Sequence, residues 1–248
     1  MSRLPNVKRT NQSSTHYPTS TSDKAVDGCT NQHLSGGCCS HTSEGAMEAW
    51  WQIDLQGQVV MEYVKIFYRY DGFLQPRRFG GYQIYQSNTS DWRNGYLCHK
   101  DTTPTPNALS LTPQIPCTGS AQYLTIYSDR RPGGLPWYSD TAILELCEVE
   151  VYGCPLDKYS KGKCERVCDA GCADSLCDPV TGECAKCVPG MYGPNCTQTC
   201  PVSCQDKCER NTGECNVVSM SRDVRYLWSC MQVYKCVCKC LLLVFFGQ

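Results

Sequence analysis

The fold is decided by the stretch LELCEVEVY at residues 144–152, in which apolar and polar side chains alternate. Cys147, Val149 and Val151 share one face of this stretch, whereas the glutamates between them share the other. Successive side chains of a β-strand point to opposite faces of a sheet, so a period of two predicts a strand. The apolar face of this strand is expected to contribute to a hydrophobic core.

The same alternation recurs upstream, between segments rich in glycine, proline, asparagine and aspartate. The further predicted strands are WWQIDL at 50–55, YVKIFYR at 63–69, YQIY at 82–85 and YLTIY at 123–127. No long helical periodicity interrupts them. This pattern predicts an all-β domain over residues 1–153, an antiparallel sandwich or barrel, and about 150 residues are enough to bury a core.

The chain contains 22 cysteines, which are sparse before Cys154 and dense after it. So many thiols favour disulfides in an oxidising, extracellular compartment, which predicts a secreted protein or ectodomain. Zinc is a poor alternative, because residues 184–187 form the one clean C-x-x-C pair and all four histidines precede the cysteine-rich part. The first residues lack the apolar region of a secretory signal, so we expect a fragment, a mature form or an imperfect gene model.

The cysteine-rich part, residues 154–215, contains an internal repeat. The cysteine spacing of 164–184 returns at 196–215, and the segment CDPVTGEC at 177–184 is echoed by CERNTGEC at 208–215. The repeat resembles tandem EGF-like modules of the laminin or multiple-EGF receptor kind. Each unit is too small and polar to fold on a core, so disulfides are expected to hold it. Residues 216–248 fit neither module. A truncated or mis-spliced end is favoured there over a membrane-touching tail.

Charge and motifs exclude several classes of function. The formal net charge is −1, and no cluster of Lys and Arg suggests a nucleic-acid footprint. No apolar run reaches the roughly 18 residues that a membrane-spanning helix needs. Since the sequence also lacks the G-x-S-x-G, H-E-x-x-H and P-loop motifs, we expect no enzyme activity.

A short segment after one predicted strand carries binding chemistry. The stretch RYDGFLQPR at 69–77 places Arg69, Asp71 and Arg77 on one loop, with His41 upstream. Arginine offers only donors, in a rigid planar fork, and the hydroxyl oxygens of a neutral polyol such as a sugar accept from it. The alternative is an ordinary solvated turn, in which Arg, Asp and Gly are common.

Several segments in order resemble the F-type lectin (fucolectin) family, a branch of the discoidin-like sandwiches. They are NQSST at 11–15, AVDG at 25–28, CSHT at 39–42, WWQIDL at 50–55 and LCEVEV at 146–151. The resemblance covers residues 6–153. It implies a jelly-roll, discoidin-like β-sandwich that recognises fucose, followed here by the small disulfide-rich modules.

The resemblance also implies roles for the residues of the loop. The family signature is a histidine followed by R-x-D-G-x4-R/K, which Arg69, Asp71 and Arg77 match; His41 lies 28 residues before Arg69, slightly farther than the family pattern. Both arginines would donate to adjacent fucose hydroxyls, and His41 would donate to a hydroxyl or the ring oxygen. Asp71 would hold an arginine or steer the loop, and Phe73 or its neighbour Leu74 would contact the sugar methyl.

A structural calcium ion is a further implication of the resemblance. The family binds the ion through loop carbonyls and acidic side chains, and calcium prefers such hard oxygens. Asp27 and Glu148 match two ligand positions, and Cys29 and Cys38 complete the candidate set. Lys24 and Cys29 stand where the family often has asparagine, and their carbonyls could serve. The alternative is that Asp27 merely fixes a turn and that Glu148 lies on an exposed strand face.

Three disulfide pairings follow from the same resemblance. They are Cys39 with Cys147, Cys98 with Cys117, and Cys29 with Cys38. Cys38 and Cys39 could exchange roles, because sequence alone does not fix connectivity.

Two functional hypotheses follow. The first is a calcium-containing lectin that recognises terminal fucose on cell-surface or microbial glycans, in innate recognition or adhesion. A few charge-assisted hydrogen bonds predict a Kd between about 1 mM and 1 μM, so an oligomer would add avidity. The second is an adhesion or scavenger-type receptor ectodomain whose binding lies in the EGF-like modules, with a sugar-inactive sandwich.

Overall fold

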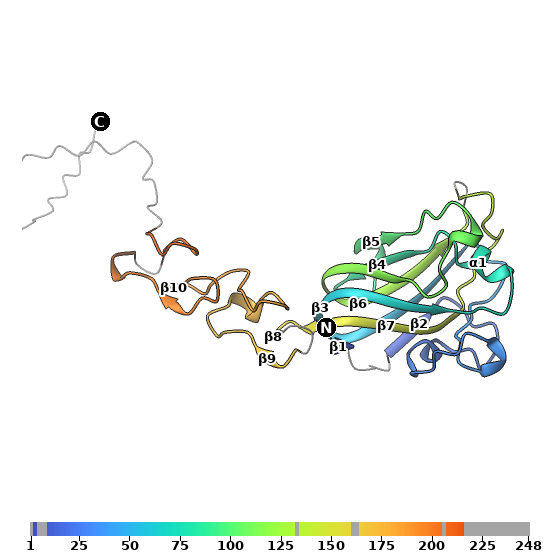
Figure 1. Cartoon of the computed structure of the whole chain (residues 1–248), viewed down its shortest axis with the longest axis horizontal. Coiled ribbons are helices and arrows are strands. Elements are labelled where there is room, and N and C mark those ends of the chain that lie inside the picture. Colours follow the sequence, from blue (N-terminus) through green and yellow to red (C-terminus); the bar gives the residue numbers. More distant parts are fainter. Residues whose placement is uncertain (1, 4–8, 132–133, 160–163, 205–206, 216–248) are drawn as a thin grey trace, which may run out of the picture. The chain divides into compact units, whose positions relative to one another are not determined.

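The computed structural model describes residues 2–3, 9–131, 134–159, 164–204 and 207–215 (Figure 1). The tail at 216–248, for which the sequence predicts a truncated or mis-spliced end, lies outside the described residues.

The predicted strands assemble into an antiparallel β-sandwich, so the fold class is confirmed. The strands are β1 (Ser2–Arg3), β2 (Arg9–Gln12), β3 (Glu48–Tyr68), β4 (Gln83–Ser87), β5 (Tyr96–Lys100), β6 (Gln114–Asp129) and β7 (Leu146–Pro155). Their order is β1-β7-β3-β6-β4-β5, and β2 pairs with the first half of β3. Every pair is antiparallel.

The central strand β3 connects the two halves of the sandwich. Residues 48–54 pair with β6, and 51–54 of them also with β2; residues 59–65 pair again with β6, and 59–68 pair with β7 on the other side. Register shifts lie between Asp54 and Val59 and between Met61 and Tyr63. Such irregularities bend and twist a strand, which allows one strand to serve both layers of a sandwich.

Short helices and small strands complete the described residues. The α-helix α1 (Leu74–Phe79) lies at one end of the sandwich (Figure 1). The 3-10 helices are η1 (Ser22–Val26), η2 (Leu34–Gly36), η3 (Trp92–Asn94), η4 (Pro106–Ala108), η5 (Ala173–Ser175) and η6 (Val202–Cys204). The cysteine-rich part adds β8 (Lys158–Tyr159), β9 (Arg166–Val167), β10 (Met191–Tyr192) and β11 (Gln198–Thr199).

Aromatic stacking fixes α1 against the core. The ring of Phe79, at the end of α1, lies between the rings of Tyr68 and Tyr82, with centroid distances of 4.2 and 4.0 Å. All three side chains are buried. Offset stacking of aromatic rings adds to the hydrophobic gain of burial. The short helix is therefore held by one residue of its own and two of the sheet.

Strand β7 differs from the sequence expectation in one respect. Its alternation is present, but the glutamates are buried as well: Glu148 is 0% exposed and Glu150 is 8% exposed. The segment after η1 covers this face, since Gly28 N donates to Glu148 Oε2 over 3.1 Å. The alternative of an exposed Glu148 is therefore wrong, because a period of two assigns a face and does not say what covers it.

The sandwich contains three disulfides, Cys29–Cys38, Cys39–Cys147 and Cys98–Cys117. They are the pairs that the resemblance implies, without the exchange of Cys38 and Cys39. Cys39–Cys147 joins residues 108 apart in the sequence, whereas Cys29–Cys38 closes a separation of 9.

Six disulfides organise the cysteine-rich part. The pairs are Cys154–Cys164, Cys168–Cys177, Cys172–Cys184, Cys187–Cys196, Cys200–Cys208 and Cys204–Cys215. The pairing pattern therefore repeats as the cysteine spacing does. Nine bridges in the described residues are typical of extracellular proteins. No helix in the same residues has the length and apolar character to cross a membrane.

We expect Cys39–Cys147 to stabilise the sandwich more than Cys29–Cys38 does. In the loop-entropy model, the long loop is worth about 5 kcal/mol and the short one about 3 kcal/mol. Denaturant unfolding of the double alanine variants Cys39→Ala/Cys147→Ala and Cys29→Ala/Cys38→Ala measures the difference. Equal losses in both variants, or a larger loss for the short loop, would contradict this ranking.

Candidate functional site

Backbone pairing next to β7 brings the candidate residues together. Ser40 N donates to Leu146 O over 2.8 Å, and Thr42 N donates to Leu144 O over 3.0 Å. Arg69 N, at the end of β3, donates to Glu145 O over 2.9 Å. Segment 40–42 and the end of β3 are therefore both fastened to the residues that precede β7, around Glu145.

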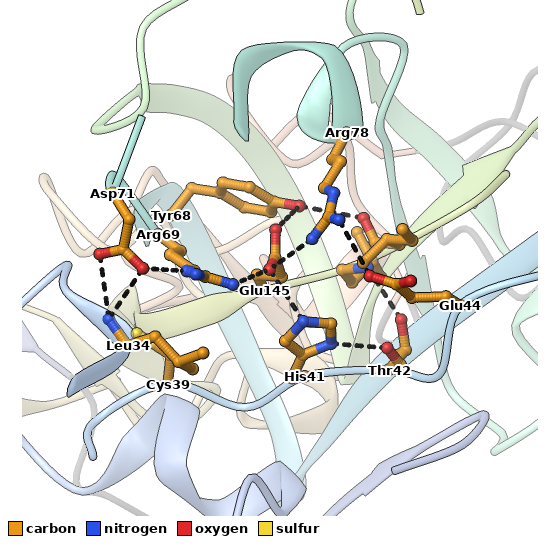
Figure 2. Close-up of polar contacts among 12 residues, drawn as sticks. Leu34, Cys39, His41, Thr42, Glu44, Tyr68, Arg69, Asp71, Arg78 and Glu145 are labelled. Carbon is orange, nitrogen blue, oxygen red and sulfur yellow. Dashed lines mark hydrogen bonds and ion pairs between the residues drawn. The ribbon is translucent and has the colours of Figure 1, made fainter. Parts of the chain in front are cut away.

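Three cationic side chains converge on one oxygen of Glu145 (Figure 2). Its Oε1 lies 2.9 Å from His41 Nε2, 2.6 Å from Arg69 Nη1 and 3.0 Å from Arg78 Nη1. The Tyr68 hydroxyl lies 3.5 Å from Oε2 and donates to Ile143 O over 3.0 Å. We call Glu145 and the three basic residues that contact its Oε1, namely His41, Arg69 and Arg78, the cation cluster.

Burial strengthens the ion pairs of Glu145 with its basic neighbours. Glu145 is 0% exposed, and a buried charge is unfavourable unless it is paired and hydrogen-bonded. Burial alone would raise the pKa of Glu145, but the hydrogen bond and charge of His41 and the charges of Arg78 and Arg69 outweigh it and lower the pKa. Glu145 is therefore a carboxylate at neutral pH.

The geometry also engages both ring nitrogens of His41. Its Nδ1 lies 2.7 Å from Thr42 O, and its Nε2 lies 2.9 Å from Glu145 Oε1. Both oxygens are hydrogen-bond acceptors, so each ring nitrogen of His41 already has a partner within the protein. The ring is 2% exposed and stacks on His16 at a centroid distance of 4.6 Å. His41 therefore supports the cluster from below the surface.

His41 also belongs to a group with metal-ligand spacing. Ligand atoms of His16, His41 and Glu44 lie within 4.8 Å of one another in the described part of the chain. A metal needs a deprotonated ring nitrogen as its ligand. Because both ring nitrogens of His41 face acceptor oxygens, the group is unsuited to a metal in this arrangement.

Asp71 fixes the other edge of Arg69. Its Oδ2 pairs with Arg69 Nε, and its two oxygens accept from Leu34 N over 3.2 and 3.3 Å. His33 Nδ1 lies 3.1 Å from Oδ1. The guanidinium of Arg69 is thus held between Asp71 and Glu145, and Nη2 is the donor that these two carboxylates do not use. The side chain remains 15% exposed.

Arg78 is fixed in a similar way. Its Nη2 pairs with Glu44 Oε1 at 2.9 Å while its Nη1 contacts Glu145. The side chain is 17% exposed. Arg130 Nη2 donates to Arg78 O over 2.8 Å, which anchors the backbone of α1. Both arginine side chains are therefore partly exposed, and each is held by the buried carboxylate of Glu145 together with a more exposed one, Asp71 or Glu44.

The structure does not bring Arg77 to the cation cluster. Its Nη1 donates to Trp137 O over 3.4 Å, and Arg77 lines an open cavity of about 730 Å³ together with Tyr70 and Phe73. Neighbouring residues of an α-helix point about 100° apart, so only one of two successive arginines can face Glu145. The signature spacing favours Arg77, but the turn of α1 selects Arg78.

Sequence reasoning missed Glu145 and Arg78. Arg78 directly follows the predicted Arg77, and Glu145 is the first glutamate of the stretch that predicts β7. The one available signal was that this stretch holds a third glutamate, two residues before Cys147. Nothing in the alternation indicates that this glutamate meets three cations from distant segments.

The residues proposed for calcium lie around the turn after η1. Asp27 Oδ1 accepts from Cys29 N over 2.9 Å, and Glu148 Oε2 accepts from Gly28 N. Lys24 Nζ lies 3.6 Å from Asp27 Oδ2. Cys29 and Cys38 are bonded to each other, so only their backbone oxygens are available. Asp27 on the turn and Glu148 on β7 thus both accept from backbone amides of residues 28 and 29.

Comparisons with known proteins agree with this architecture. Residues 24–126 match the family model described as F5/F8 type C, NedA-like, galactose-binding domain. The fucolectin from the serum of Morone saxatilis (striped bass) is 24% identical, with a TM-score of 0.50, over 61% of this chain and 48% of that chain. The lectin domain of lectinolysin complexed with Lewis B antigen is 23% identical, with a TM-score of 0.50, over 61% and 96%.

A fucose binding module of Streptococcus pneumoniae, SpX-3, is 27% identical, with a TM-score of 0.48, over 61% of this chain and 98% of the module. No curated protein matches the chain. The chain spans about half the length of the striped bass protein. The striped bass and lectinolysin structures show a discoidin-like sandwich fold, and residues 24–126 of this chain match the galactose-binding domain model.

We expect Glu145→Gln to destabilise the sandwich by about 3–5 kcal/mol, because it leaves His41, Arg69 and Arg78 without their buried anion. Glu44→Gln is the matched control. The Glu44 side chain is 50% exposed, so loss of its pair with Arg78 should change the free energy of unfolding by about 1 kcal/mol or less. Denaturant unfolding at pH 7 measures both variants.

The pH dependence supplies a second test of Glu145. A lowered pKa in the folded state contributes stability above the ordinary carboxyl range, which is lost as the pH falls through the folded pKa. The difference in free energy of unfolding between the protein and its Glu145→Gln variant should therefore begin to narrow below about pH 4.3, the ordinary Glu pKa. It should vanish as the pH falls through the lowered folded pKa. A gap that is absent at pH 7, or that does not change with acid, would contradict the assignment.

Proposed function

We propose that this protein binds terminal fucose on glycans through the guanidinium groups of Arg69 and Arg78. The observation that carries the proposal is that both groups reach the surface with fixed orientations. Each is held from behind by the same buried carboxylate of Glu145. Donors fixed in advance lose little entropy when a ligand binds.

The chemistry suits neighbouring hydroxyl groups. A guanidinium donates in a planar fork, and hydrogen bonds to charged groups contribute about 1.5–3 kcal/mol each. In this proposal His41 holds Glu145 in place and does not contact the sugar, because the ring is buried and both its nitrogens are engaged. Leu74 is 45% exposed and offers apolar surface for the methyl group of fucose.

The comparisons support the proposal. The matched family model carries the description galactose-binding. The striped bass protein is a fucolectin, and the lectinolysin domain was solved with Lewis B antigen. This chain has the same fold and carries two fixed guanidiniums, so fucosylated glycans are the proposed partners. A single site of this kind binds weakly and would gain from multivalency.

The variants Arg69→Gln and Arg78→Gln should each weaken fucose binding by about tenfold or more, since each loses a charge-assisted hydrogen bond. Retention on fucose-agarose and calorimetric titration with L-fucose measure the loss. Arg166→Gln, at an exposed position of β9, is the control and should bind as the unchanged protein does. Circular dichroism verifies that each variant is folded.

A second candidate function follows from the same ion pairs. Because Glu145, Asp71 and Glu44 already accept from the arginines, the sandwich could be inactive toward sugar. Binding would then lie in the cysteine-rich repeat, which we propose to consist of EGF-like modules paired at 168–177, 172–184 and 187–196. No retention of the folded protein on fucose-agarose would favour this candidate.

We also propose that calcium binds at the turn after η1, through the carboxylates of Asp27 and Glu148 and the carbonyls of the same turn. The support is the convergence of both carboxylates on residues 28 and 29. Bound calcium would neutralise these acids and fasten the turn to β7.

Calcium should therefore raise the melting temperature of the protein relative to a sample in EDTA. A ligand at 100 times its Kd stabilises the folded state by about 2.7 kcal/mol. Differential scanning fluorimetry measures the shift, and Asp27→Asn should reduce it. Magnesium at the same concentration controls for ionic strength, and an identical melting temperature in calcium and in EDTA would exclude the site.

A further inference from the structure

The cavity that Arg77 lines shares the loop 69–78 with the cation cluster. Tyr70 lines the cavity and lies in the chain between Arg69 and Asp71, which form an ion pair with each other. Arg77 lines it and directly precedes Arg78. Consecutive Cα atoms are 3.8 Å apart, so one oligosaccharide can reach both surfaces.

The cavity has walls that hydrogen bonds hold together. The side chain of Gln32 joins three segments. Its Nε2 donates to Tyr68 O over 2.5 Å and lies 3.3 Å from Leu111 O. Tyr70 N donates to Gln32 O over 2.7 Å. These hydrogen bonds hold together the end of β3, residue 32 and residue 111 at the wall of the cavity. We call this cavity the groove.

Aromatic surface and a single charge define what the groove can bind. Tyr70 and Phe73 are 59% and 80% exposed, and their rings offer faces on which a pyranose ring can pack. Of the described residues that line the groove, Arg77 alone carries a charge, and Asn107, Thr112 and Gln32 are neutral polar groups. The groove therefore combines a sugar-sized apolar wall with one cation and no acid.

The contact of Arg77 leaves most of its donors for a ligand. The hydrogen bond from Nη1 to Trp137 O is long, at 3.4 Å, and Arg77 forms none of the described ion pairs. Arg69 and Arg78, by contrast, each contact two carboxylates. A guanidinium that is not neutralised favours an anionic partner, and its fork matches carboxylate or sulfate oxygens.

We infer that the groove is a second carbohydrate subsite that takes an acidic sugar, a pyranose with a carboxylate or sulfate group, next to the fucose of the same glycan. This inference rests on the proposed function of the cation cluster. Tyr70 and Phe73 pack against the ring of the acidic sugar, and Arg77 pairs with its anionic group. The loop 69–78 thus contributes residues to two subsites.

The test compares a neutral fucosylated trisaccharide with its sialylated and sulfated counterparts, by calorimetric titration of the full chain. At least one acidic glycan should bind about tenfold more tightly than the neutral one, which corresponds to about 1.4 kcal/mol. Arg77→Gln should remove this preference and leave the Kd of the neutral glycan unchanged. Arg78→Gln should weaken binding of all three glycans.

Arg93→Gln is the matched control, because Arg93 is an arginine on η3, away from loop 69–78 in the sequence, with a side chain 57% exposed. It should keep the acidic preference. The sialylated and sulfated arms distinguish a carboxylate from a sulfate as the anion. Equal affinity for neutral and acidic glycans, or a preference that survives Arg77→Gln, overturns the inference while the neutral glycan still reports on the cation cluster.

One further arm separates the inference from the proposed function. If the neutral fucosylated glycan does not bind, the proposed function fails. Sialyllactose and sulfated lactose, which carry no fucose, then test the groove by itself. Binding of either one that Arg77→Gln abolishes upholds an acidic-sugar site, and absence of such binding overturns it.

Discussion

A single buried carboxylate, Glu145, organises the end of the sandwich where α1 lies. Its oxygen Oε1 is shared by the imidazole of His41 and by two guanidiniums of the loop 69–78, and both segments are distant from Glu145 in the sequence. Each of these cations is poorly hydrated in this position and would be unfavourable without the anion, and the anion would be unfavourable without them. The four groups therefore form one arrangement, and the geometry of each guanidinium depends on all of them.

The rest of the fold maintains this arrangement by independent means. The disulfide Cys39–Cys147 joins the residue before Ser40 to the residue after Leu146, whose backbones are themselves hydrogen-bonded. It fixes the separation between His41 and Glu145 by covalent bonds. Stacking of Phe79 on the sheet and the hydrogen bond from Arg130 to Arg78 O hold α1, and hence Arg78, in place. Covalent, apolar and polar forces thus converge on the same few side chains.

Much of the fold could be predicted from the sequence, because strand alternation is a local property. The segments at 50–55, 63–69, 82–85, 123–127 and 144–152 all lie largely in strands. Burial could not be predicted in the same way. The glutamates of β7 occupy the face that the pattern assigns to them, but η1 and the turn after it cover that face, and this contact joins residues 120 apart.

The site was predictable to a smaller extent, for a geometric reason. The motif locates the loop and identifies Arg69 and Asp71, which do pair. It does not say which of two successive arginines turns toward the core, since that depends on where a helix of six residues begins. Glu145 is invisible to a motif read along the loop, because it lies 76 residues after Arg69, in the segment just before β7.

The loop 69–78 separates two kinds of side chain, and this separation has a physical consequence. Arg69 and Arg78 are tied to a fully buried anion, so changes there disturb the fold together with any ligand contact. Tyr70, Phe73 and Arg77 face solvent in the groove, and substitutions at such exposed positions usually alter stability little. In the proposed function, the residues that recognise fucose are therefore also needed for stability. The exposed residues of the groove can be substituted at little cost in stability, and they set the preference for the neighbouring sugar. A rigid donor pair beside an adaptable wall lets one scaffold keep a common terminal sugar and discriminate among the glycans that carry it.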